Sequence, residues 1–251
     1  MPHSRRGRRP RGHDGFVFSL AAIFAVWFVL LAISPVSRPT WALENVLVVA
    51  ALVLLARTYR GFPLSRISYG MIFVFLMLHE VGSHYTYSLV PYDAAFEAAF
   101  GTQLGELFGW QRNHFDRVIH FSYGLLLAYP IREAFLRIAD VRGFWGYFLP
   151  LDLTMSTSMI YELIEWGAAS LFGGEVGPAY LGTQGDPWDA HMDMALASLG
   201  AAVAMGVTLG VNFWLQRDFS REWAESLEVK HPEPLGEERI AEMLEEREGS
   251  L

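Results

Sequence analysis

Long apolar runs alternate with short segments containing Pro, Gly or Arg along most of this chain. A helix needs roughly 20 mostly apolar residues to cross the hydrocarbon core of a bilayer, which is about 30 Å thick. Several runs reach that length, and the first, from Phe16 to Ser34, carries no charge. The pattern predicts an all-α, polytopic membrane helix bundle with six spans, at about 16–34, 41–57, 67–90, 114–137, 144–171 and 189–215.

The segment between the third and fourth spans has a different pattern. Within 93–111, apolar residues recur at helical spacing among polar ones: Phe96, Ala99, Phe100, Leu104 and Phe108. An amphipathic helix of this kind lies in the headgroup region with its apolar face buried. We therefore expect one interfacial helix here.

The composition agrees with a membrane location. Hydrophobic residues make up 52% of the 251 positions and the mean hydropathy is positive, which is too apolar for an average soluble domain. Cys is absent, so disulfides and thiolate metal ligands are excluded. Any bound metal must be held by His and carboxylate side chains.

The net charge of −8 hides an asymmetry between the two ends, because arginines crowd the start and acidic residues crowd the end. A basic start is typical of a cytoplasmic flank and does not indicate nucleic-acid binding here. A signal peptide is less consistent, since the apolar run exceeds the usual length of about 7–15 residues and no A-x-A type site follows Ser34. We expect a basic arm at 1–15, a six-span membrane domain at 16–216 and an acidic tail at 217–251.

Arginines near the ends of the spans predict the orientation. If the N-terminus lies inside, the inner turns collect Arg57, Arg60, Arg66, Arg132, Arg137, Arg142, Arg217 and Arg221. The outer turns keep only Arg38, Arg112 and Arg117. The bias predicts a multi-pass membrane protein with both termini in the cytoplasm.

Four of the predicted spans each carry a pair of ionisable residues one helical turn apart. The pairs are Glu80/His84, Asp116/His120, Glu162/Glu165 and Asp189/Asp193. In the orientation that the arginines predict, all four pairs fall near the outer side. Burying an ionisable side chain in a membrane costs free energy, so the convergence of these pairs at one depth indicates a polar site there.

The spacing lets each pair face a single cavity, because residues at i and i+4 lie about 40° apart around a helix, and those at i and i+3 about 60°. Helix bundles build carboxylate metal sites in this way. His and carboxylate ligands suit Zn, Fe or Mn, and the lack of sulfur argues against Cu(I). The candidate ligands are Glu80, His84, Asp116, His120, Glu162 and Asp193.

The remaining polar residues are candidates for supporting roles. Glu165 or Asp189 is a candidate general base, and Arg117 is placed to form a salt bridge or bind an anionic headgroup. Among the other histidines, His114 is a plausible addition. His79 and His191 are weaker ones, because on regular helices they point away from the acidic partners.

Four stretches of the chain resemble the YjdF-type family of bacterial inner-membrane proteins. They are His79-Glu80-x-x-x-His84-Tyr85, Arg112-Asn113-x-x-Asp116-Arg117-x-x-His120-Phe121, Tyr161-Glu162-x-x-Glu165-Trp166 and Gln184-Gly185-Asp186-x-Trp188-Asp189, the last continuing to Asp193-Met194. The resemblance covers roughly residues 15–215. It implies a multi-span membrane fold and carries no catalytic assignment.

These features predict a metal-dependent membrane enzyme that acts on a lipid or lipid-linked substrate at the periplasmic leaflet, with water activated by the metal and one carboxylate as general base. A di-metal oxidoreductase on the same ligands is a variant. The alternatives are a transporter or ion-coupled permease, and a non-catalytic scaffold whose polar residues lock the helices.

Overall fold

The computed structural model describes residues 12–172, 183–230 and 236–249, and all regular structure within these ranges is helical. Long helices form the bundle: α1 His13–Leu31, α2 Arg38–Thr58, α3 Arg66–His84, α6 Phe115–Ile138, α7 Trp145–Phe172 and α9 Asp189–Leu215. Shorter helices lie outside it: α4 Tyr92–Phe100, α5 Leu104–Phe108, α10 Phe219–Ser226 and α11 Glu237–Glu248. The expected fold class is therefore confirmed as all-helical, and each predicted span corresponds to one long helix.

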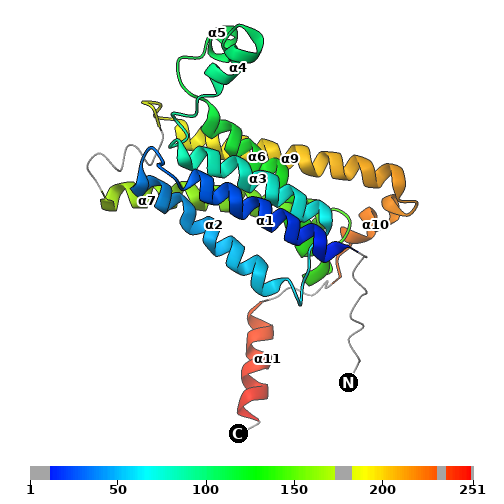
Figure 1. Ribbon diagram of the computed structural model, residues 1–251. Coiled ribbons are helices and arrows are strands. Elements are labelled where there is room, and N and C mark those ends of the chain that lie inside the picture. Colours follow the sequence, from blue (N-terminus) through cyan, green and yellow to red (C-terminus); the bar gives the residue numbers. More distant parts are fainter. Residues whose placement is uncertain (1–11, 173–182, 231–235, 250–251) are drawn as a thin grey trace.

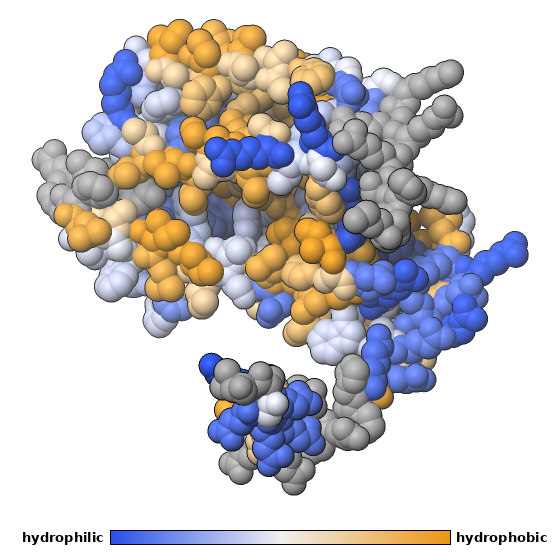
Figure 2. Space-filling model, turned by 90° about the horizontal axis from the view of Figure 1, so that it is seen from below, coloured by the Kyte–Doolittle hydropathy of each residue, from blue (hydrophilic) through white to orange (hydrophobic). Residues whose placement is uncertain are grey.

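Three of the described helices, α1, α2 and α9, are long and apolar enough to cross a membrane by length and composition. The other three long helices, α3, α6 and α7, do not meet this criterion. Buried ionisable residues on them are His79, Glu80, His120 and Glu165. Exposed apolar side chains cover much of the bundle, among them Val26, Leu54 and Val207. Figure 2 shows hydrophobic patches on one face of the bundle, interspersed with paler and hydrophilic residues, and hydrophilic α11 apart from the bundle.

The centre of the bundle is the tight pairing of α6 with α9 (Figure 1). A Cβ at Gly124 would overlap the carbonyl of Ala197, and a Cβ at Gly200 would overlap the carbonyl of Phe121. Only glycine allows the two backbones to approach this closely. This pairing brings the first turns of α6 and α9 together, and the candidate site lies there.

The remaining long helices pack around this pair. α3 and α7 both contact α6, and α1 packs on α3. Phe24, Val48 and Leu76 form a small core where α1, α2 and α3 meet. α2 contacts the bundle mainly through α3 and then diverges from it (Figure 1).

The predicted interfacial helix is in fact two helices, α4 and α5, which project together from one end of the bundle (Figure 1). Gly101 ends α4 in the left-handed conformation, with φ 77°, and Gly109 ends α5 in the same way, with φ 67°. A left-handed residue stops the helical hydrogen-bond ladder, and glycine adopts it without steric cost. Phe100, Leu107 and Phe108 are exposed on this lobe.

The segment beyond 217 divides into two parts. α10 packs on the bundle: Gly143 N donates to Glu222 Oε1 at 3.1 Å, Phe144 N donates to Ser226 Oγ at 3.0 Å, and Trp223 packs against the core around Tyr147. α11 projects away (Figure 1). The expected basic arm falls largely on residues 1–11, outside the described ranges.

Candidate functional site

Three ligand atoms converge where α6 meets α9. Asp116 and His120 on the first turns of α6, and Asp193 on α9, each offer one such atom, and these atoms all lie within 4.8 Å of one another. His120 Nε2 is 3.6 Å from Asp116 Oδ1. Asp193 is only 2% exposed. These residues are called the triad below.

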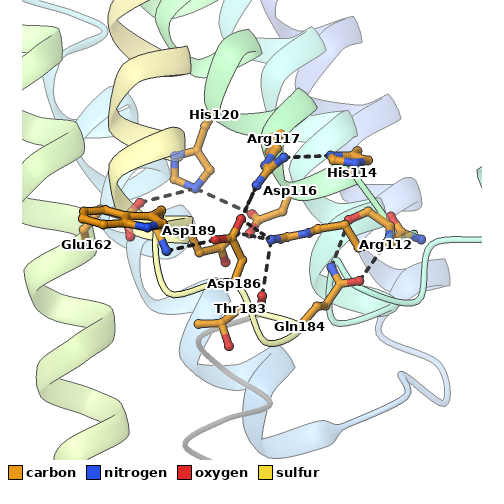
Figure 3. Close-up of polar contacts among 12 residues, drawn as sticks. Arg112, His114, Asp116, Arg117, His120, Glu162, Thr183, Gln184, Asp186 and Asp189 are labelled. Atoms are coloured by element: carbon orange, nitrogen blue, oxygen red, sulfur yellow. Dashed lines mark hydrogen bonds and ion pairs between the residues drawn. The ribbon is translucent and has the colours of Figure 1, made fainter. Parts of the chain in front are cut away.

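A fourth predicted ligand approaches the triad from α7. Glu162 Oε1 lies 3.6 Å from His120 Nε2 (Figure 3). That oxygen and Asp193 Oδ1 are both buried and accept no hydrogen bond from any described residue. Buried polar atoms are normally satisfied, so these two oxygens fit a site that takes a cation. Asp116, His120, Glu162 and Asp193 thus come together from three helices.

Two arginines and two aspartates close the end of the site beside the triad (Figure 3). Arg112 Nη1 lies 2.7 Å from Asp189 Oδ1, and Arg117 Nη2 lies 2.6 Å from Asp186 Oδ2. Arg112 also reaches Asp186 Oδ2 at 3.3 Å. These four residues are called the clasp. Arg117 therefore forms the salt bridge that was expected as one of its two roles, and its partner is Asp186 rather than the adjacent Asp116.

Hydrogen bonds extend the clasp along the loop before α9. The Gln184 side chain accepts from Asn113 N and donates to Asn113 O, both at 2.9 Å, and Arg112 donates to Thr183 O at 3.3 Å. Asp186 Oδ1 accepts from Trp188 N at 2.9 Å and so caps the turn that opens α9. The loop is thereby held against the start of α6.

The clasp also sets the charge of the groups around it. The Trp188 N–H and then the Arg117 and Arg112 guanidinium groups hold the pKa of Asp186 below its ordinary value. Partial burial, followed by the charges of Arg117 and Arg112, lowers the pKa of His114. His114 Nδ1 lies 3.3 Å from Arg117 Nη1, and its ring packs on Trp110. Asp186 is thus kept ionised and His114 neutral near pH 7.

A second group of buried polar residues lies where α2, α3 and α7 face one another. Glu44 on α2 is 3% exposed, and its Oε2 accepts from Tyr161 Oη at 2.9 Å and from Tyr87 Oη at 3.5 Å. Tyr87 Oη lies 2.7 Å from His79 Nδ1. Together with Glu80, these residues are called the Glu44 cluster. The sequence analysis missed Glu44, although a lone acid in an apolar run is itself a signal of function.

Glu80 and His84, the predicted pair on α3, have different surroundings in the structure. Glu80 is fully buried, at 0% exposure. His84 turns away from the triad: its Nδ1 bonds the Leu31 carbonyl at 2.7 Å, and its ring contacts Tyr85. α3 ends at His84, and the left-handed residues Thr86 and Tyr87 reverse the chain there.

His79 takes the inward position instead. The Tyr87 ring folds back over Gly82, where any Cβ would overlap it, and the ring meets His79, which is 7% exposed. His79 was expected to be marginal, because the prediction used the angle to Glu80 alone. The turn after α3, which the sequence analysis did not foresee, gives His79 its partner.

The remaining predicted residues have distinct surroundings. Glu165 is buried on α7, within electrostatic range of Glu44, Asp116 and Glu162, so it lies near both the triad and the Glu44 cluster. Asp189 is buried and ion-paired to Arg112. His191 is exposed on α9 and packs against the Trp188 ring, away from the triad.

An all-helical chain with an apolar outer surface and ionisable residues gathered in its interior is a membrane protein. Residues 16–212 match the family model described as predicted membrane protein DUF2238, and the chain belongs to that family. It is 38% identical to the inner membrane protein YjdF of Escherichia coli (strain K12) over 174 residues, which cover 69% of this chain and 79% of that protein. The resemblance to the YjdF-type family is thus confirmed. No solved structure matches the chain.

Proposed function

We propose that this protein is a metal-dependent enzyme that acts on a lipid or lipid-linked substrate at the periplasmic side of the inner membrane. The observation that carries the proposal is the convergence of Asp116, His120 and Asp193 within 4.8 Å. One imidazole and two carboxylates are a ligand set that Zn²⁺, Fe²⁺ or Mn²⁺ accepts. Glu162 would complete or support this set.

When bound, a divalent ion would polarise a substrate oxygen and make water a competent nucleophile near neutral pH. The protein residues would then divide the remaining work. Asp189 is already held in an ion pair by Arg112 at 2.7 Å. Glu165 has no ion-pair partner within the described residues, so of the two expected bases Glu165 is the better candidate. Arg117 would hold Asp186 and the loop in place.

The lipid character of the substrate is supported by the surface of α7 around Glu162. Leu163, Ile164 and Trp166 are exposed and apolar, while Glu162 points toward His120 (Figure 3). A substrate that approaches from the bilayer along α7 would meet these side chains first.

The membrane arrangement is part of the proposal. The six long helices would all cross the bilayer, with both termini in the cytoplasm. The arginine bias between α2 and α3 and between α6 and α7 supports this orientation. The triad and the clasp would then lie at the periplasmic end, with α4 and α5 in the outer interface.

One observation favours a second candidate function, a non-catalytic scaffold. The clasp joins the start of α6 to the start of α9 through ion pairs at 2.6 and 2.7 Å, and such contacts stabilise a helix arrangement without any chemistry. The two orphaned oxygens of Glu162 and Asp193 favour the metal site over this alternative.

The test is a search for lipid products. The full-length protein is placed in vesicles of bacterial inner-membrane lipid extract, supplied in turn with Zn²⁺, Mn²⁺ or Fe²⁺, and the lipids are compared by mass spectrometry. We expect the wild-type protein to consume one lipid class in the presence of metal. The His120→Ala variant should lack this activity, and the His191→Ala variant should keep it. An unchanged lipid profile with all three ions and folded wild-type protein would refute the enzymatic proposal.

A further inference from the structure

We propose that Glu44 of α2 is a positioning residue for the metal site. It fixes Tyr161 of α7, and Tyr161 in turn holds the His120 ring in the orientation that a metal ligand needs. Among the described residues, Glu44 forms no hydrogen bond or ion pair with the triad itself, so it would act through Tyr161. The inference rests on the proposed function, because His120 is a ligand only if the triad binds a metal.

The orientation of the His120 ring depends on packing. Its Nε2 lies 3.6 Å from Asp116 Oδ1 and 3.6 Å from Glu162 Oε1. A metal-binding histidine usually donates its other ring N–H to an outer partner, which fixes the ring. Within the described residues the His120 ring forms no hydrogen bond. The aromatic ring that packs on it is Tyr161, edge to face, with the centroids 5.9 Å apart.

Tyr161 is held at its hydroxyl end by the carboxylate of Glu44. Tyr161 Oη donates to Glu44 Oε2 at 2.9 Å, across 117 positions of the chain. Glu165, the candidate base, also interacts with Tyr161. Glu162 follows Tyr161 directly on α7. A movement of Tyr161 would therefore disturb both the packing of His120 and the carboxylate that faces it.

Glu44 occupies a position where packing alone would favour an apolar residue. It is 3% exposed, and no basic side chain pairs with it in the part of the chain that the structure describes. An ionisable residue buried in a membrane helix costs free energy. α2 contacts the bundle mainly through α3, and an apolar side chain would serve that contact. What the acid adds is its hydrogen bonds to the hydroxyls of Tyr161 and, at 3.5 Å, Tyr87.

Spectroscopy of bound Co²⁺ tests the inference, because the visible absorption of this ion reports the geometry of its ligands. Metal-stripped full-length protein in detergent is titrated with Co²⁺, and the spectrum and the dissociation constant are recorded. Tyr161→Phe and Glu44→Leu should each bind Co²⁺ about tenfold more weakly than wild type, with a changed spectrum. Glu44→Gln keeps an oxygen that accepts the Tyr161 hydroxyl, so it should resemble wild type in both respects.

Tyr87→Phe is the matched control. It removes the other hydroxyl that bonds Glu44, and the Tyr87 ring packs on His79 rather than on His120. This variant should keep the wild-type affinity and spectrum, even if its melting temperature falls. If Glu44 only locked the helices together, Tyr161→Phe and Glu44→Leu would behave in the same way.

The outcomes separate the inference from the proposed function. Wild-type Co²⁺ affinity and spectrum in folded Tyr161→Phe would overturn the positioning role while the proposed function stands, and this variant suffices if Glu44→Leu does not fold. Binding by Glu44→Gln as weak as that of Glu44→Leu would also overturn the role, because the effect would then follow the charge and not the hydrogen bond. No Co²⁺ binding by folded wild-type protein would overturn both.

Discussion

Arg117 Nη2 on α6 lies 2.6 Å from Asp186 Oδ2, across 69 positions of the chain. The contact joins the start of α6 to the loop that opens α9, and these are the two segments that supply the triad. Asp186 lies beside the site rather than in it, so the clasp can be tested apart from any chemistry.

The first prediction concerns Asp186. Its pKa is depressed in the folded protein, so its contribution to stability is present above the unfolded value of about 3.9 and is lost as the pH falls through the folded pKa. Asp186→Asn should lower the melting temperature at pH 7, and the difference from wild type should shrink below about pH 4.

The measurement is thermal unfolding in detergent at a series of pH values. Asp218→Asn is the matched control, because Asp218 forms an exposed pair with Arg221 that contributes little. If Asp186→Asn lowers the melting temperature equally at pH 7 and pH 3, the charge of Asp186 is not what holds the loop.

The second prediction concerns the close packing of α6 and α9. Gly124→Ala places a methyl group on the carbonyl of Ala197, and backbone cannot rotate aside as a side chain can. We expect a loss of about 1–3 kcal/mol in the free energy of unfolding, together with lower metal retention, because the two halves of the triad move apart.

Gly210→Ala on α9 is the control for that substitution. Gly210 has open space around its Cβ position, so alanine there should be neutral or stabilise the helix by roughly 0.5–1 kcal/mol. Equal behaviour of the two variants in a denaturation series would contradict the packing that the structure shows.

The third prediction concerns the opposite end of the bundle. Glu133 accepts from Ser65 N at 2.9 and 3.0 Å, from Ser68 Oγ at 2.6 Å and from Arg137 at 2.8 Å. It thereby ties α6 to the N-terminus of α3. Glu133→Ala should cost about 1–3 kcal/mol by leaving these donors unpaired, whereas Asp152→Ala, which removes an exposed acid within α7, should cost much less. A chemical denaturation series on both variants decides it.

The fourth prediction concerns topology. Alkaline phosphatase is active only outside the cytoplasm, so fusions report the side of each loop. A fusion after Gly61, between α2 and α3, should be inactive, and one after Thr102, between α4 and α5, should be active. The reverse pattern would place the triad on the cytoplasmic side and overturn the proposed orientation.

The bounds of the long helices were largely predictable, because apolar runs end where Pro, Gly or Arg begins. The predicted last span, 189–215, coincides with α9. The convergence of Asp116, His120 and Asp193 was also predictable, since one-turn spacing puts each pair on one face. The division of the expected interfacial helix into α4 and α5 could not be predicted, because a glycine such as Gly101 is compatible with a continuous helix as well as with a break.

The Glu44 cluster was harder to predict for three-dimensional reasons. Glu44 has no partner one turn away, so no spacing marks it. The choice between His79 and His84 depends on the turn at Thr86 and Tyr87, which folds the Tyr87 ring against Gly82. The pairing of Arg112 with Asp189 depends on how α6 meets α9, and local sequence carries no record of that contact.

The most direct test of the central claim is the metal content of the purified protein. The full-length chain is isolated without a polyhistidine tag, loaded with Zn²⁺, Fe²⁺ or Mn²⁺, desalted and analysed by mass spectrometry for metals. We expect at least one ion per chain in wild type, a loss of most of it in His120→Ala, and full retention in His191→Ala. Folded wild-type protein that retains none of the three metals, or a His120→Ala variant that binds as much as wild type, would contradict a metal site at Asp116, His120 and Asp193.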